Sequence, residues 1–325
     1  MREPYTYYRE GILKGDKYVL AKAITLAESS IEEDKNLFHS ILNGIIDRTG
    51  TAIRVGVTGV PGVGKSTFIE ALGSYLISKG SKVAVLAIDP SSIKTGGSIL
   101  GDKTRMNALS MNESAFIRPS PARKTLGGVS GATRENILLC EAAGFDVIII
   151  ETVGVGQSET MIRGMVDFFL LLMLPGAGDE LQGMKRGIME MADGIIINKA
   201  DGDDIQMAKI AEADYRNALH LFPISEQGWL PKVQSCSSTK GEGIAEVWEM
   251  IQDYRQEAIR KGFWDTKRQS QNIDWFKDQL SKSLVDRFLQ NNQARSTKAK
   301  LEDSIRNGEI HPREALEQLL DRVFG

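Results

Sequence analysis

Cysteine and histidine are both scarce in this chain of 325 residues. The two cysteines, Cys140 and Cys236, cannot build a disulfide framework, and they fit a reducing compartment. The three histidines, His39, His220 and His311, stand far from one another and from the cysteines in the sequence. This spacing argues against a structural metal site made of His and Cys ligands.

A basic excess is absent as well. Lys and Arg number 40 against 43 Asp and Glu, which gives a formal net charge of -3. Proteins that hold nucleic acid or an anionic membrane by charge usually carry a basic excess. We therefore expect neither nucleic acid nor a membrane as the main partner.

Long apolar runs are also missing. The longest uninterrupted run, 168–174, stops at Pro175 and is too short to cross a bilayer, so it predicts a buried strand. Charged residues interrupt the start of the chain, and the acidic residues Glu3 and Glu10 argue against a secretory signal or a transit peptide. We expect a cytoplasmic protein.

The spacing of apolar residues predicts an α/β fold with a mainly parallel sheet. Residues 1–50 carry apolar positions at helical spacing, whereas from residue 53 onward short apolar runs alternate with stretches of helical length. Continuous apolar strands separated by helices are typical of a parallel sheet covered on both faces. The predicted strands are 53–58, 82–89, 115–118, 146–152, 168–174, 194–198 and 232–237.

After residue 262 the strand pattern ends and helices are predicted over 264–290, 297–307 and 312–324. The first of these helices has an apolar stripe, Ile273, Phe276, Leu280, Leu284 and Phe288. The stripe predicts a contact between two subunits, because an apolar face needs burial; the alternative is that it packs on its own domain. We expect three parts, 1–50, 51–262 and 263–325.

A phosphate-binding loop is predicted over 59–66, which matches G-x-x-x-x-G-K-[ST] between a predicted strand and a predicted helix. Glycines let backbone N–H groups converge on phosphate oxygens, and the helix N-terminus adds a favourable partial charge. Lys65 would reach the β- and γ-phosphates, and the Ser66 hydroxyl would ligate Mg²⁺. The alternative is a glycine-rich turn with a chance lysine. The predicted phosphate-binding residues are Gly59, Pro61, Gly62, Val63, Gly64, Lys65, Ser66 and Thr67.

A guanine-binding motif, N-K-x-D, is predicted over 198–201. The Asp201 carboxylate can accept hydrogen bonds from guanine N1–H and the 2-amino group, a donor pair that adenine lacks. Asn198 would support the base edge, and the Lys199 stem would lie over the ring. Ser237 and Ser238 follow the last predicted strand and fit the loop that touches the guanine from its other side; the alternative is a polar turn.

Carboxylates end two more predicted strands. Glu151, followed by Gly154, occupies the place of the usual D-x-x-G, where a carboxylate can hold Mg²⁺ and the glycine N–H can sense the γ-phosphate. Asp89 ends another strand, and Asp102 lies in the polar stretch 90–105. For both aspartates we predict a place near Mg²⁺ or the γ-phosphate, and the alternative is turn and N-cap chemistry.

Together these motifs resemble the MeaB/ArgK family of P-loop GTPases, which includes the mitochondrial methylmalonic aciduria type A protein. The most specific shared segments are 96–106, 151–159 and 175–185. The resemblance implies a G domain of the SIMIBI type with helical N- and C-terminal extensions, and a homodimer. It implies GTP or GDP binding with Mg²⁺, and a chaperone that assists cofactor loading and protection of adenosylcobalamin-dependent methylmalonyl-CoA mutase or a related acyl-CoA mutase.

The resemblance also implies roles for individual residues. Asp89, Asp102 and Glu151 are expected around Mg²⁺ and the γ-phosphate, while Asp179, Gln182 and Lys185 match the loop called switch III. No glutamine directly follows Gly154, so intrinsic hydrolysis is expected to be slow. The predicted catalytic residues are Lys65, Asp102, Glu151, Gln182 and Lys185.

Three alternatives remain open. A kinase or ATPase of an amino-acid transport system would need a hydroxyl-presenting partner and a catalytic base. A nickel-type maturation GTPase usually carries extra His or Cys ligands. A pure GTP-gated binding module would have negligible turnover, so slow hydrolysis that a mutase stimulates would distinguish the GTPase from it.

Overall fold

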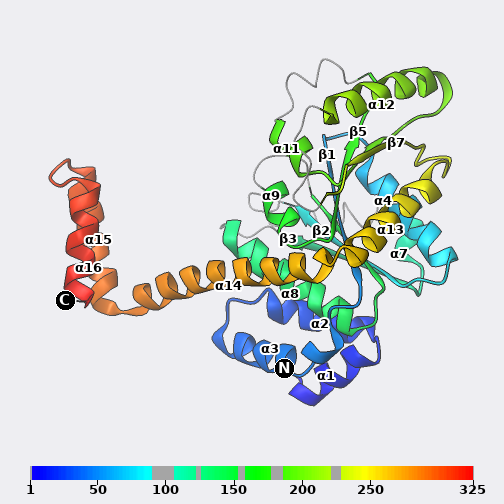
Figure 1. Cartoon of the computed structure of the whole chain (residues 1–325). Helices are drawn as coiled ribbons and strands as arrows, with labels where there is room; N and C mark the ends of the chain where they lie inside the picture. The colour runs from blue at the N-terminus through cyan, green and yellow to red at the C-terminus, as the bar shows by residue number, and fades with distance from the viewer. Residues whose placement is uncertain are drawn as a thin grey trace. The chain divides into compact units, whose positions relative to one another are not determined.

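A single parallel sheet organises the protein. The computed structural model describes residues 2–89, 106–121, 126–152, 158–176, 186–220 and 228–324. The sheet has the order β3-β2-β4-β1-β5-β6-β7, and its neighbouring strands pair in parallel (Figure 1). The strands are β1 (Ile53–Gly59), β2 (Val83–Asp89), β3 (Ala115–Pro121), β4 (Val147–Glu151), β5 (Phe168–Met173), β6 (Gly194–Ile197) and β7 (Lys232–Ser235). All seven predicted strands are present, so the predicted α/β fold is confirmed.

Helices precede, separate and follow these strands. The N-terminal segment forms α1 (Tyr5–Leu13), α2 (Lys17–Ala27), α3 (Glu32–Asn43) and the 3-10 turn η1 (Ile46–Arg48). The helices among the strands are α4 (Lys65–Ser78), α7 (Asn107–Ser110), α8 (Leu126–Ala142), α9 (Ser158–Arg163), α11 (Arg186–Met191), η2 (Gly202–Asp204), α12 (Ile205–Leu219) and α13 (Ile244–Arg260). The chain ends in α14 (Phe263–Gln290), α15 (Asn292–Arg306) and α16 (Pro312–Phe324). None of the described helices has both the length and the apolar character that a membrane span requires.

The sheet is buried on both faces, as its apolar strands predict. Along β4, Ile148 and Ile150 point into a core shared with α1–α3 and α8, whereas Val147 and Ile149 point into a core shared with α4 and α13. This alternation follows from the two-residue repeat of a strand. Figure 1 shows the N-terminal helices next to α8, so they cover one face of the sheet together with it.

The chain separates into two compact units, Met1–Gln271 and Asn272–Gly325, and α14 continues through the boundary. In the second unit the helix predicted over 297–307 starts earlier, at Asn292. The Asn291 side chain caps it by accepting hydrogen bonds from the backbone N–H groups of Gln293 at 2.8 Å and Ala294 at 3.3 Å. Because the first turn of this helix is polar, the apolar spacing did not indicate it.

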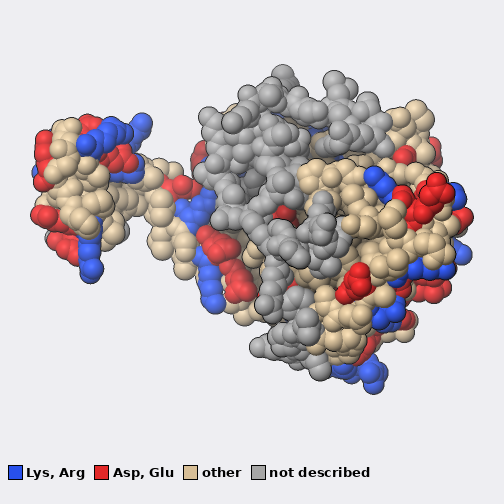
Figure 2. Space-filling view, turned by 90° about the horizontal axis from the view of Figure 1, so that it is seen from above, with Lys and Arg blue, Asp and Glu red and all other residues tan. Residues whose placement is uncertain are grey.

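Charged residues of both signs are mixed on the surface of the described residues. Seen from above, Lys and Arg lie next to Asp and Glu (Figure 2), in keeping with the nearly balanced charge.

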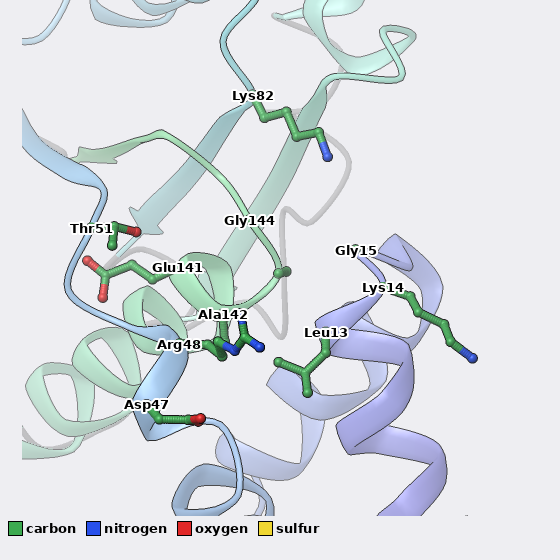
Figure 3. Close-up of a pocket in the computed structure, with 11 residues that line it drawn as sticks. Leu13, Lys14, Gly15, Asp47, Arg48, Thr51, Lys82, Glu141, Ala142 and Gly144 are labelled. Atoms are coloured by element: carbon green, nitrogen blue, oxygen red, sulfur yellow. The ribbon is translucent and has the colours of Figure 1, made fainter.

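A cavity of about 550 Å³ opens at the amino ends of β2 and β4 (Figure 3). This is the opposite end of the sheet from the phosphate loop, which follows the carboxyl end of β1. It is lined by Leu13, Lys14, Gly15, Asp47, Arg48, Thr51, Lys82, Glu141, Ala142, Ala143 and Gly144.

Buried ion pairs gather at the amino ends of β1 and β5. Arg54 donates to Glu141 at 2.9 and 3.1 Å, and Arg268 donates to both oxygens of Asp167 at 2.8 and 2.6 Å. Nearby, Arg163 pairs with Asp193. A buried charge requires such partners, because an unpaired one costs several kcal/mol, on the order of 3–5, when a partner is removed.

Lys267 adds a fourth cation to this cluster, which among the described residues contains only three carboxylates, Glu141, Asp167 and Asp193. Its ammonium donates to the Asp167 carbonyl and, at 2.9 Å, to the Tyr254 hydroxyl. Burial lowers the pKa of Lys267 to about 8, while Asp193 opposes the shift and Arg163 adds to it. The folded protein therefore releases this proton at a lower pH than the unfolded chain, whose lysine has the ordinary pKa of 10.5.

We expect the stability contributed at Lys267 to rise with pH between about 8 and 10.5, because the unfolded chain then binds more protons than the folded one. The rise has a ceiling of about 3 kcal/mol, at about 1.4 kcal/mol for each pKa unit. The measurement is denaturant unfolding of wild type and Lys267→Met across this pH range. The exposed Lys282→Met on the same helix is the control, and a wild-type advantage over Lys267→Met that stays constant with pH contradicts the prediction.

Candidate active site

The phosphate loop has the predicted context of strand, loop and helix. β1 ends at Gly59, and α4 begins at Lys65. Gly62 and Gly64 adopt positive φ angles of 82° and 92°, a region that side chains with a Cβ rarely enter. The loop therefore needs glycine at these two positions for its backbone path, as the motif indicates.

Asn198 joins the phosphate loop to the predicted base motif. It follows β6, is buried, and its Nδ2 donates to the Val63 carbonyl at 2.8 Å. A Cβ at Gly64 would lie 2.8 Å from the same nitrogen, so the glycine also makes room for this contact. The structure thus brings together two motifs separated by more than a hundred residues.

Lys65 bends back over the loop. Its ammonium donates to the carbonyl oxygens of Gly59 at 2.8 Å and Val60 at 3.3 Å. Burial lowers the pKa of Lys65, and the negative charges of Glu151 and Glu159 oppose this shift. A lysine held over a loop of backbone N–H groups is the arrangement that receives nucleotide phosphates.

Two oxygen groups meet beside the loop. The Ser66 hydroxyl donates to Glu151 Oε1 at 3.2 Å, and Glu151 ends the buried strand β4. A hydroxyl and a carboxylate are the hard oxygen ligands that Mg²⁺ prefers, so these side chains fit that ion. β2 ends at Asp89, and its pairing of Ala87 with Glu151 puts Asp89 at the same edge of the sheet.

The base motif is held by hydroxyl groups of the loop after β7. Asn198 Oδ1 accepts from the Ser238 hydroxyl at 2.6 Å. Asp201 Oδ2 accepts from Ser237 and, at 3.2 Å, from Thr239. The Ser237 hydroxyl lowers the pKa of the Asp201 carboxyl and so favours its ionised form.

Lys199 lies between these residues with a backbone φ of 61°, the single positive value outside glycine in the described part of the chain. Such a conformation carries a cost of about 1–3 kcal/mol and often marks a functional position. The sequence analysis did not predict the contact of Thr239 with Asp201, because it assigned only Ser237 and Ser238 to the loop beside the base. The sequence feature that could have indicated Thr239 is its position, as a third residue with a hydroxyl group directly after the two serines.

Several predicted site residues fall outside the described ranges. These are Asp102, Gly154, Asp179, Gln182 and Lys185. Of Asp89, only the backbone is described. Pro61 and Thr67 are exposed, at the loop and in the first turn of α4. The described residues thus bring the phosphate loop, Glu151 and the base motif to one edge of the sheet.

Comparison with known proteins gives concordant matches. A family model described as "Methylmalonyl Co-A mutase-associated GTPase MeaB" matches residues 20–293. The chain is 48% identical over 307 residues to a probable GTPase of Mycobacterium tuberculosis, covering 94% of this chain and 91% of that one. It is 42% identical over 320 residues to the mouse "Methylmalonic aciduria type A homolog, mitochondrial", covering 95% of this chain and 77% of that one.

A solved structure is similar over nearly the whole chain. The crystal structure of an "LAO/AO transport system kinase" superimposes with a TM-score of 0.77 at 38% identity, covering 98% of this chain and 96% of that one. The shared fold agrees with the parallel sheet and phosphate loop of a P-loop NTPase.

We expect Asp201→Ala to weaken GTP binding about a hundredfold, because guanine would lose its two hydrogen bonds to the carboxylate. Asp201→Asn should shift the preference toward xanthosine triphosphate, since the amide NH₂ can donate to the carbonyl that xanthine carries in place of the amino group. Titration with labelled nucleotides measures both effects. The exposed Asp203→Ala is the matched control, and equal wild-type affinity for GTP and ATP would refute the guanine assignment.

Proposed function

The chain belongs to the MeaB family of GTPases, and from this premise we propose that it is a chaperone of an adenosylcobalamin-dependent methylmalonyl-CoA mutase or a related acyl-CoA mutase. The family description names association with this mutase, and the mouse relative carries the name of methylmalonic aciduria type A. The matched range 20–293 contains both nucleotide motifs and the segment 175–185. This match over most of the chain is the observation that supports the partner.

We propose that the nucleotide lies with its phosphates on the loop 59–66 and its guanine at Asp201. The hydrogen bond from Asn198 to Val63 supports this placement, because it sets the base motif next to the phosphate loop. The hydroxyls of Ser237 and Thr239 both donate to Asp201 Oδ2, so Oδ1 remains available to accept from a base. Lys65 would exchange its two loop carbonyls for the β- and γ-phosphates.

Mg²⁺ is proposed to bind at Ser66, Asp89, Asp102 and Glu151. The contact between Ser66 and Glu151 supports this set, since it places two oxygen ligands beside the loop. Bound there, the ion would neutralise charge on the phosphate oxygens. The chain's own contribution is to hold the Ser66 hydroxyl, in the first turn of α4, next to the Glu151 carboxylate at the end of β4.

The loop 175–185 is proposed to signal between the mutase and the phosphate site. Lys185 could neutralise charge that develops on the γ-phosphate, and Gln182 could position the attacking water. Both roles need these two side chains next to the γ-phosphate, and we propose that the bound partner brings them there. Basal hydrolysis would then proceed slowly without these residues.

We expect Lys185→Ala to change basal GTP turnover little but to remove most of the stimulation by the mutase. Lys65→Ala should impair turnover under both conditions, because its phosphate contact needs no partner. Phosphate release is measured for each protein with and without an adenosylcobalamin-dependent acyl-CoA mutase from the same source. The exposed Lys209→Ala is the control; full stimulation of Lys185→Ala refutes the role of Lys185, and an unstimulated wild type refutes the partner.

A homodimer through α14 is proposed on the basis of its exposed apolar stripe. Ile273, Phe276, Leu280 and Leu284 have between 46% and 63% of their surface exposed within one chain. They recur every three or four residues and so lie along one face of the helix. An apolar face of this kind is stabilised when a second subunit covers it.

We expect the full-length protein to have twice the mass of the 35.8 kDa chain in solution. The double variant Phe276→Asp/Leu280→Asp should be monomeric, because two charges would be buried in the contact. Light scattering at micromolar concentration measures the mass. Ile210→Asp, at an exposed apolar residue of α12, should leave it unchanged, and a monomeric wild type contradicts the proposal.

A transport-system kinase is a second candidate, because the similar crystal structure carries that title. A kinase transfers the γ-phosphate to an acceptor group, whereas a GTPase releases it to water. GTP labelled at the γ-phosphate distinguishes them. Label recovered only as inorganic phosphate, in the presence of the transport-system proteins, favours the GTPase chaperone.

A further inference from the structure

The turn between α9 and β5 is held by side chains from elsewhere in the fold. Gln271 Nε2 donates to the carbonyls of Val166 at 2.9 Å and Arg163 at 3.5 Å. The carbonyl of Gly164 accepts from Arg134 of α8, and the carbonyl of Asp167 accepts from Lys267. Helix ends leave carbonyls without intrahelical partners, so α14 and α8 together cap the carboxyl end of α9.

Gln271 is itself fixed where it stands. It is 8% exposed, and its backbone carbonyl accepts from the second arm of Arg134. One turn earlier, Arg268 and Lys267 bind Asp167. Gln271 Oε1 is buried and has no hydrogen-bond partner among the described residues. In the described contacts the amide therefore acts through its N–H groups and not through its oxygen.

The other end of α9 lies at the phosphate site. Its first turn carries Glu159, which is 1% exposed and acts electrostatically on Lys65. The helix connects β4 to β5, and these strands flank β1 on its two sides. Glu151 at the end of β4 binds Ser66. At six residues α9 is short, and too short to be stable by itself, so its position depends on what holds its ends.

We propose that Gln271 is a positioning residue for GTP hydrolysis. It caps α9 at its carboxyl end and thereby fixes the amino end, with Glu159, against the phosphate loop. Gln271 does not touch the nucleotide. Its loss displaces α9, which slows the chemical step but leaves the loop 59–66 and the base motif able to hold GDP.

The test uses the full-length protein and the variant Gln271→Met. Methionine fills nearly the same space, cannot donate to the two carbonyls, and removes the unpaired oxygen. We expect single-turnover GTP hydrolysis to fall about tenfold or more, since small displacements of a catalytic group cost this much. The affinity for GDP should stay within about twofold. The melting temperature should fall by no more than a few degrees, because two carbonyls lose their donor while one unpaired oxygen is removed. Gln269→Met, at an exposed glutamine of the same helix, should match wild type.

Each result decides the proposal. Hydrolysis by Gln271→Met at the wild-type rate overturns it. A parallel loss of hydrolysis, GDP affinity and melting temperature also overturns it, because Gln271 would then only stabilise the fold. If Gln271→Met does not fold, Arg134→Lys gives a second test, since lysine cannot reach Gly164 and Gln271 at once. Slower hydrolysis with unchanged GDP affinity in Arg134→Lys supports the proposal, and unchanged hydrolysis overturns it.

Discussion

The parallel pairing of β1 with β4 on one side and β5 on the other is the constraint on which the rest of the structure depends. Its register sets Val57 opposite Glu151, so the carboxylate that ends β4 arrives beside the loop that follows β1. The Thr58 and Thr152 hydroxyls, 2.8 Å apart, join the two strand ends one residue further on. Because β4 and β5 lie on opposite sides of β1, the chain between them must cross it, and α9 makes that crossing.

Asn198 gives the other link across the site. Its amide nitrogen donates to the phosphate loop, and its amide oxygen accepts from the loop after β7. A buried amide with both ends satisfied defines one arrangement of its neighbours, because any other leaves a polar group unpaired. The phosphate loop and the loop after β7 are therefore joined through a single side chain.

Much of this fold follows from local sequence. The runs at β4 and β5 are continuously apolar, a pattern that few structures besides a buried parallel strand satisfy, and they were predicted almost to the residue. The phosphate loop and the N-K-x-D motif were recognised for a similar reason, since each is a contiguous segment with fixed chemistry. The start of α15 was predicted too late because a polar cap, Asn291, determines it.

Contacts between distant segments could not be predicted in this way. Arg268 and Asp167 are 101 residues apart, and nothing in either neighbourhood indicates the other. The same holds for Gln271 and the carbonyls of the α9–β5 turn, because backbone carbonyls carry no sequence signal. Thr239 and Asp201 also meet only after β6 and β7 have paired. The topology of the sheet decides which distant segments meet. The detailed path of the backbone then decides which side chains of those segments form a contact.

The place where α14 begins has a consequence for how this protein can be dissected. The sequence pattern suggests a cut after residue 262, at the end of the strand-containing region. That cut would remove Lys267, Arg268 and Gln271, and so would leave Asp167 without its arginine and the turn after α9 without its donors. A shortened protein made in this way would differ from the full chain in its GTPase core as well as in its missing helices. A cut after residue 271, where the first compact unit ends, would keep all three of these residues and their contacts.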